Sequence, residues 1–158
     1  MSKEDLYDKK KTSAAAANFL HNDFWHYMNL GGIHPNQLSS PRLDLAPGGH
    51  SNTNTTEKAL IGTMSEAERA QWVAQTILLA INECTDFNNR KHKSLIRDFY
   101  LEDLTNEEVK IRLNFSEYQV RREKPKALIE FSERLEYWKK RRDCTDQEIP
   151  RLLVPKST

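Results

Sequence analysis

Between residues 116 and 126 the chain gathers side chains that can read or hold double-stranded DNA. Arginine can bridge the two acceptors of guanine, and glutamate can accept a hydrogen bond from the amino group of cytosine. Lysine suits phosphate groups, which position a protein on a duplex without reading its sequence. The candidate DNA-binding residues are Ser116, Glu117, Tyr118, Gln119, Arg121, Arg122, Lys124 and Lys126.

These side chains need a helix that presents them on one surface. Residues three and four apart share a helix face, so a helix from Ser116 would group Tyr118, Arg121 and Arg122. Val120 would point the opposite way, toward the preceding helix. Ser116 is a good N-cap, and the free backbone N–H groups at such a helix start can also hold a phosphate.

The residues before Ser116 predict the first half of a helix-turn-helix, which would span about residues 105–124. Thr105 and Glu108 fit a capping box that starts a short helix, and Val109 and Leu113 give it an inward apolar face.

A further helix over about residues 89–101, with Leu95, Ile96, Phe99 and Tyr100 on one face, would support this pair. A duplex major groove admits one helix, whose first turns meet the base edges. The pattern therefore favours DNA binding, and the competing interpretation is a solvated basic face on an ordinary helical core.

The charge distribution agrees with a nucleic-acid partner, although the formal net charge of the whole chain is only +1. Residues 1–86 hold 7 Lys/Arg and 10 Asp/Glu, residues 87–142 hold 15 and 10, and residues 143–158 hold 2 and 3. The candidate residues lie in the basic segment. The run Lys139–Arg142 in that segment is typical of a helix C-terminus, where the dipole favours cations, or of a second phosphate contact.

Outside this segment the chain also predicts helices, so we expect an all-α fold with no strand pattern and no hairpin turn. A 1–30 N-terminal segment holds an amphipathic helix from about Lys11 to Leu30, which ends at Gly31-Gly32. A 31–62 stretch rich in Pro, Gly and Ser reads as a flexible linker. The 63–142 part is the helical DNA-binding domain, its first helix capped by Ser65 with Glu68, and a 143–158 tail follows.

Several classes of protein are disfavoured by the sequence. It holds no apolar run long enough for a membrane span, and its charged start lacks the features of a secretory signal. Cys84 and Cys144 are expected to be free thiols. No histidine has zinc-ligand spacing, and Gly48-Gly49 lacks the rest of a phosphate loop. We expect no metal, no cofactor and no enzymatic activity.

Two families resemble parts of this chain. The segment 116–128, with its Ser-x-x-x-aliphatic-Arg start and Lys-Ala-Leu close, resembles the recognition helix of the fourth region of bacterial sigma factors. More broadly, residues 77–131, centred on Phe99–Thr105, resemble the ArpU-like regulators of Gram-positive phages, as do the pieces Phe24–Tyr27 and Leu38–Pro41. That family activates transcription of phage late genes for packaging and lysis.

The resemblance implies base-facing roles for Glu117, Tyr118, Arg121 and Arg122, with Lys126 toward a phosphate. It also implies a regulator in the cytoplasm of a bacterial host that binds promoter DNA and activates either by touching host RNA polymerase or by placing the DNA. For such a regulator we expect a monomer or homodimer. The chain departs from the sigma-like pattern at two positions. Glu123 replaces an apolar residue, and Pro125 predicts either a kink or a new helix that starts there.

An assembly role is the competing hypothesis. A phage small terminase subunit also joins a helix-turn-helix to oligomerising helices, and it binds packaging-site DNA. The aromatic face of the N-terminal helix, with Phe24 and Trp25, would dock on the helix that holds Trp72, or would contact a second copy or the polymerase.

Overall fold

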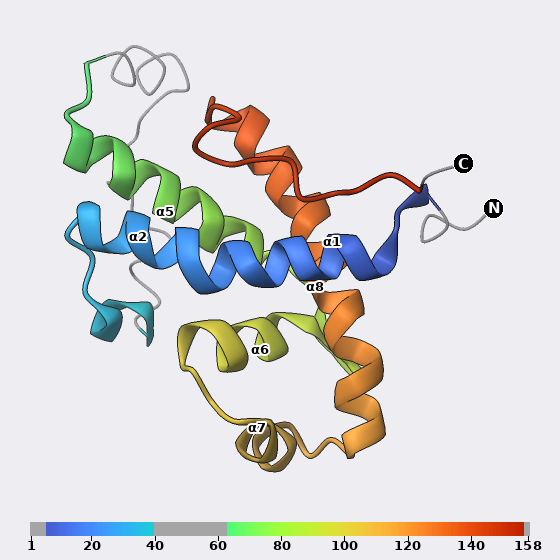
Figure 1. Cartoon of the computed structure of the whole chain (residues 1–158). Helices are drawn as coiled ribbons and strands as arrows, with labels where there is room; N and C mark the ends of the chain where they lie inside the picture. Colours follow the sequence, from blue (N-terminus) through green and yellow to red (C-terminus); the bar gives the residue numbers. More distant parts are fainter. Residues whose placement is uncertain (1–5, 40–62, 157–158) are drawn as a thin grey trace.

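Capping side chains determine where most of the helices begin. In the computed structural model, which describes residues 6–39 and 63–156, Ser65 and Thr105 form the expected capping boxes with the residue three positions on. Ser116 is the expected N-cap of α8, and it too forms a capping box, with Gln119. The helices are α1 (Lys9–Asn18), α2 (Phe24–Leu30), α5 (Glu66–Asn82), α6 (His92–Ile96), α7 (Asn106–Leu113) and α8 (Glu117–Arg141). A mainly helical fold is therefore confirmed (Figure 1).

The N-terminal helix is continuous from Lys9 to Leu30, because a π-helical turn at Phe19–Asp23 joins α1 to α2. Asp8 caps it by accepting a hydrogen bond from the backbone N–H of Lys11. It ends at Gly31 as expected, and a Cβ there would stand 2.8 Å from the backbone of Gln71. The end of α2 thus approaches α5 more closely than a side chain would allow.

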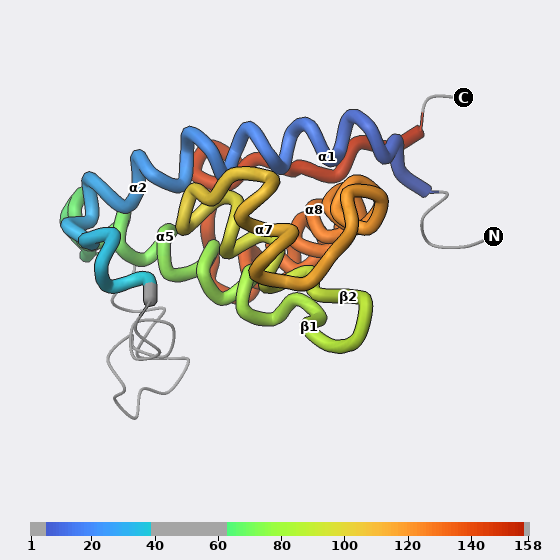
Figure 2. Tube along the Cα trace, turned by 90° about the horizontal axis from the view of Figure 1, so that it is seen from below, coloured from blue at the N-terminus to red at the C-terminus, as the bar shows by residue number. Residues whose placement is uncertain are grey.

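The long helix α8 lies at the centre of the packing. It contacts α1, α5, α6 and α7, while α2 packs on α5, the helix that holds Trp72. Figures 1 and 2 show α1 crossing the middle of α8. The C-terminal half of α8 is embedded in the core, and the N-terminal half of α8 projects beside α7 at one end of the molecule. The largest fully buried side chains include Phe19, Phe24, Phe131, Leu20, Met28, Ile77, Leu78, Ile81, Leu95, Ile96 and Leu135.

A small β-hairpin corrects the predicted helix over residues 89–101. The strands β1 (Asp86–Phe87) and β2 (Arg90–Lys91) pair antiparallel, and the helix begins only at His92. Asn88 has a φ of 52°, a left-handed conformation that asparagine tolerates better than most residues. From His92 the helix continues through a π-helical segment, Arg97–Leu101. The expectation of no strand and no hairpin turn is therefore wrong at this two-residue asparagine turn.

The beginning of the predicted linker and the C-terminal tail are both packed. Ile33, just before a 3-10 helix at Pro35–Ser39, and Leu38, within that helix, are both buried, whereas residues 40–62 lie outside the described part. The segment after α8 runs back beside α1, where Tyr7 and Pro155 form a β-bridge (Figure 1). Its aliphatic residues Ile149, Leu152 and Leu153 are buried. Apolar side chains in otherwise polar stretches explain both differences from the expectation.

Helix α8 continues across Pro125, so the alternative of a new helix starting at that residue is wrong. The carbonyl of Pro125 accepts a hydrogen bond from the Ser13 hydroxyl at 3.4 Å, where α1 crosses. Contacts from both flanking turns of α8 hold the helix despite the missing N–H, because Val120, Ala127 and Leu128 are all buried.

Cys84 and Cys144 are free thiols. Within residues 6–39 and 63–156, no helix combines the length and the apolar character that a membrane crossing requires.

Candidate nucleic-acid interface

The N-terminal half of α8 has two distinct faces. Val120 and Leu128 are buried on one of them, together with Val109, Leu113 and Phe115 from α7 and the turn. Asn114 adopts a left-handed conformation, with φ 56° and ψ 45°, and so ends α7 and redirects the chain into α8. The three residues between these helices therefore give the short connection that the sequence predicts.

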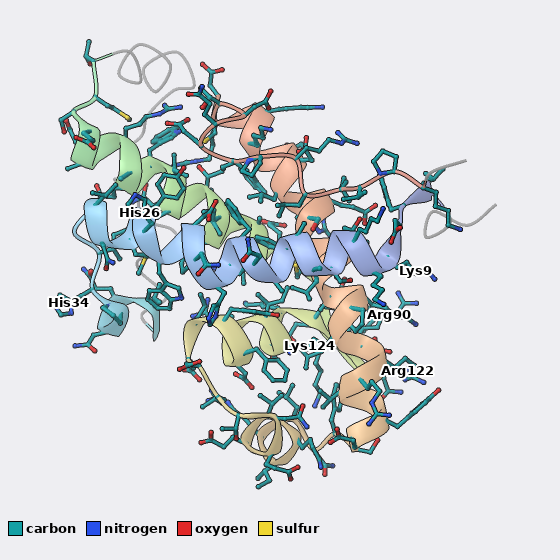
Figure 3. All side chains as sticks on the ribbon, viewed as in Figure 1. Lys9, His26, His34, Arg90, Arg122 and Lys124 are labelled. Atoms are coloured by element: carbon teal, nitrogen blue, oxygen red, sulfur yellow. The ribbon has the colours of Figure 1, made fainter. Side chains whose placement is uncertain are left out.

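The other face exposes the arginines and the tyrosine. The side chain of Arg121 is 75% exposed, and its nearest acidic partner, Glu117, is 3.6 Å away. The guanidinium of Arg122 stands over the ring of Tyr118, 5.3 Å from the ring centre. Lys126 is also exposed, at the outer limit of ion-pair distance from Glu123 (4.0 Å). These groups are the exposed cationic and aromatic side chains in the first turns of α8, and Figure 3 labels Arg122 among them.

Three candidate residues have structural partners at the start of α8. The Ser116 hydroxyl accepts from the Gln119 backbone N–H, and the Gln119 side chain accepts from the Ser116 backbone N–H. Glu117 accepts a hydrogen bond from the amide of Asn106 and forms an ion pair with Lys110, both on α7. The hydrogen bond from Lys110 is the main reason why the pKa of Glu117 lies below its usual value. These contacts fix the first turn of α8 against α7.

Lys124 differs from the other candidates because it faces the protein. Its ammonium stands 3.9 Å from the ring centre of Phe99 and 5.8 Å from that of Tyr100. Figure 3 shows it between α8 and the segment that follows α6, on the opposite side of α8 from Arg122. Burial lowers the pKa of Lys124. Its role is therefore to join α8 to the aromatic pair.

Replacing Lys124 by alanine should destabilise the fold by about 1–2 kcal/mol, because it removes a half-buried cation from an aromatic surface. If the chain binds DNA as its sequence predicts, the DNA affinity of this variant, at a temperature where it is folded, should stay near that of the unaltered protein. Urea unfolding followed by circular dichroism measures the first effect, and a binding titration measures the second. A large loss of DNA affinity without destabilisation would contradict this placement.

A cavity of about 670 Å³ brings in two cations that the sequence analysis did not identify. Its lining includes Lys9 from α1 and Arg90 from the hairpin, together with Arg122 and Lys126 from α8. Figure 3 shows Lys9, Arg90 and Arg122 on the same side of the molecule. Because these residues are far apart in the chain, no spacing rule could have grouped them.

Glu123, where the sigma-like pattern has an apolar residue, is only 4% exposed. One of its oxygens accepts a hydrogen bond from Arg122 at 2.9 Å, and the other lies 3.1 Å from a ring nitrogen of His92. Burial alone would raise the pKa of Glu123, but these two hydrogen bonds outweigh it and lower the pKa. A buried carboxylate is thus retained at an expected apolar position because it is paired.

Two of the four side chains in the basic run at the end of α8, Lys139 and Arg142, are buried. The ammonium of Lys139 lies 2.5 Å from Asp146, and Arg142 stacks 3.6 Å from the ring centre of Trp72. Arg142 also donates a hydrogen bond to the hydroxyl of Thr76 at 2.7 Å. Only Lys140 and Arg141 of this run are exposed. The run therefore offers less charge to a phosphate than its sequence suggests.

In the described ranges, no three His, Cys, Asp or Glu side chains converge in a way that could hold a metal ion. No protein-family model, no curated protein and no solved structure matches this chain.

Proposed function

We propose that this chain binds double-stranded DNA in a sequence-specific way through the first turns of α8. The observation that carries the proposal is the division of that half-helix into a buried apolar face and an exposed face with Tyr118, Arg121, Arg122 and Lys126. A B-DNA major groove accommodates one α-helix, and arginine is the side chain best suited to read guanine there.

The surroundings of α8 are compatible with this docking mode. The short helix α7 packs against α8 across a tight turn, and this pairing supports the proposal that the two helices dock on DNA as a helix-turn-helix. The cations of the neighbouring cavity, Lys9 and Arg90, lie beside Arg122, where the sugar-phosphate backbone would flank an inserted helix. They would add affinity without sequence preference.

A role in transcription is the second part of the proposal, and it is supported by the resemblance to ArpU-like regulators. In this role the protein would bind promoter DNA of a phage in the cytoplasm of its bacterial host and activate late genes. Activation would proceed either by contact with host RNA polymerase or by placing the DNA.

Selection of bound sequences from a random DNA pool, followed by footprinting, tests the proposal. We expect one enriched motif and one protected site. Recovery of no motif, with equal affinity for all duplexes, would refute sequence-specific binding. Light scattering on the purified protein tests the competing assembly role: a monomer or dimer agrees with a regulator, and a ring would favour a protein of the small terminase type.

Replacing Lys126 by alanine should weaken binding to every duplex alike. Loss of one phosphate contact should reduce the slope of log affinity against log salt concentration by about 1. Titrations at several salt concentrations, with the selected site and with an unrelated duplex, measure both effects. Lys140→Ala is the matched control, because this exposed lysine lies in the other half of the same helix. An unchanged salt slope for Lys126→Ala would exclude it from the interface.

A further inference from the structure

His92 lies between two carboxylates of α8. Its Nδ1 is 2.7 Å from one oxygen of Glu130, and its Nε2 is 3.1 Å from one oxygen of Glu123. The histidine is the first residue of α6 and is only 7% exposed. The two glutamates are seven residues apart, on either side of Pro125. The imidazole therefore bridges two turns of α8 across the position that lacks a backbone N–H.

The remaining carboxylate oxygens are also occupied. The second oxygen of Glu123 accepts from Nε of Arg122 at 2.9 Å. The second oxygen of Glu130 accepts from the backbone N–H and the hydroxyl of Thr85, both at 3.0 Å, and from Arg134 at 3.2 Å. A continuous chain of hydrogen bonds thus runs from the loop before the hairpin through His92 and Glu123 to Arg122.

This arrangement requires the doubly protonated ring. A neutral imidazole has one donor and one acceptor nitrogen, so it would direct a lone pair at one of the carboxylates. Burial alone lowers the pKa of His92, but the hydrogen bonds and charges of Glu130 and Glu123 outweigh it and raise the pKa above 6.5. Burial alone would raise the pKa of Glu130, but the hydrogen bonds from His92, Thr85 and Arg134 outweigh it and hold the pKa at about 2.

The other charged groups around this cluster come from three elements. Three are cations of α8 and one is an acid of α8, while α1 and the hairpin each add a cation. They are Arg122, Lys126, Arg134, Glu133, Lys9 and Arg90. Asp86, from the hairpin, is directed to Ser94 by a 2.8 Å hydrogen bond. When the ring loses its proton, the net charge of the cluster of one histidine and two glutamates changes from −1 to −2.

We propose that His92 is a positioning residue for DNA recognition: its imidazolium holds Glu123, and through it the guanidinium of Arg122, in the orientation that faces the duplex. This inference rests on the proposed DNA-binding function. The longer of the two contacts is the one to Glu123, so loss of the proton releases that carboxylate first. The negative charge of Glu123, beside the DNA-facing side chains, is then no longer balanced by the imidazolium, and affinity falls as the pH rises.

The direction in which pH changes the stability and the DNA affinity follows from the raised pKa of His92. Because its pKa is raised in the folded protein, the stabilisation by the bridge is fully present below pH 6.5 and is lost as the pH rises through the raised value. DNA affinity should fall over the same range. Between about pH 5.5 and about pH 8.5, we expect a decrease of about fivefold, near the lower end of what loss of an arginine–guanine contact costs.

Binding titrations over this pH range, at constant salt, test the proposal. His92→Gln should flatten the profile, whereas the control His26→Gln, an exposed histidine on α2, should retain it. Glu130→Gln should move the midpoint to lower pH, because it removes one of the charges that raise the histidine pKa. A merely structural role would not move that midpoint. An unshifted midpoint in Glu130→Gln, or a profile in His92→Gln equal to that of the unaltered protein, would overturn the proposal.

Nuclear magnetic resonance without DNA separates this inference from the proposed function. The ring nitrogens of His92 and the Nε–H of Arg122 should titrate with one common midpoint in the full-length protein. If His92 titrates and Arg122 does not respond, the positioning role is refuted even where DNA binding is established. If they titrate together and no duplex binds at any pH, the coupling within the protein stands and the proposed DNA-binding function fails.

Discussion

Replacing Arg122 by alanine should weaken binding to the selected DNA site by about 1–3 kcal/mol, which corresponds to about 5- to 150-fold in affinity. It should also relax the base preference at one position of the site, because the fork of donors that can bridge guanine is lost. Arg121→Ala should have an effect of the same size at a different base position. Its guanidinium is more exposed than that of Arg122 and is less constrained by neighbours.

The control for these experiments is a variant that loses the same charge outside the proposed interface. Arg141→Ala provides it, because this exposed arginine lies at the far end of the same helix. Affinities of all three variants are measured on the selected site and on single-base variants of that site. If both Arg121→Ala and Arg122→Ala bind every one of these duplexes as the unaltered protein does, α8 is not the recognition helix.

Replacing Ile149 by alanine should lower the free energy of unfolding by about 2–5 kcal/mol, which is the usual cost of truncating a buried aliphatic side chain. Ile149 is 0% exposed, although it belongs to a segment that looks like a polar tail in the sequence. A loss of this size is a large part of the total stability of a typical domain, which is about 5–15 kcal/mol.

Urea unfolding monitored by tryptophan fluorescence measures this loss, since Trp72 contacts Arg142 at the start of the same C-terminal segment. Arg151→Ala serves as the control two residues away, because this side chain is exposed and makes only a 3.7 Å ion pair with Glu136. A stability of Ile149→Ala equal to that of Arg151→Ala would show that the segment adds little to the core.

The helix starts were predictable because their signals are local. A capping box needs a hydroxyl residue and an acid or amide three positions later, as Ser65 and Glu68 or Thr105 and Glu108 illustrate. The buried and exposed faces of α8 were predictable for the same reason. Val120 and Leu128 are both buried, and Arg121 is exposed, as helical spacing requires.

The contacts of the site were less predictable, because they join residues that are distant in the chain. His92 meets Glu123 across 31 positions and Glu130 across 38. Each of these residues alone is typical of a solvated surface. The orientation of Lys124 was unpredictable for the same reason. Helical geometry places Lys124 on one face of α8, but whether another segment covers that face depends on the packing of the distant Phe99 segment.

Short polar segments were the other features that the sequence did not predict. The two asparagines at positions 88 and 89 form a hairpin, and sequence periodicity cannot detect strands of two residues. In the C-terminal segment, Ile149, Leu152 and Leu153 have the spacing of a helix face, but three apolar residues in a short polar stretch are too few to predict an element. The segment is in fact irregular, and these side chains are buried by packing against distant parts of the chain.

Helix α8 extends over 25 residues, about 38 Å at 1.5 Å per residue, and it holds the exposed Arg121 and Arg122 in its first turns and the buried Phe131 further along. The surface and the core therefore share one hydrogen-bonded rod. A ligand that binds the native state at the first turns must raise the free energy of global opening for the whole rod. Amide hydrogen exchange around Phe131 should then slow when such a ligand is bound, although no ligand atom reaches that residue.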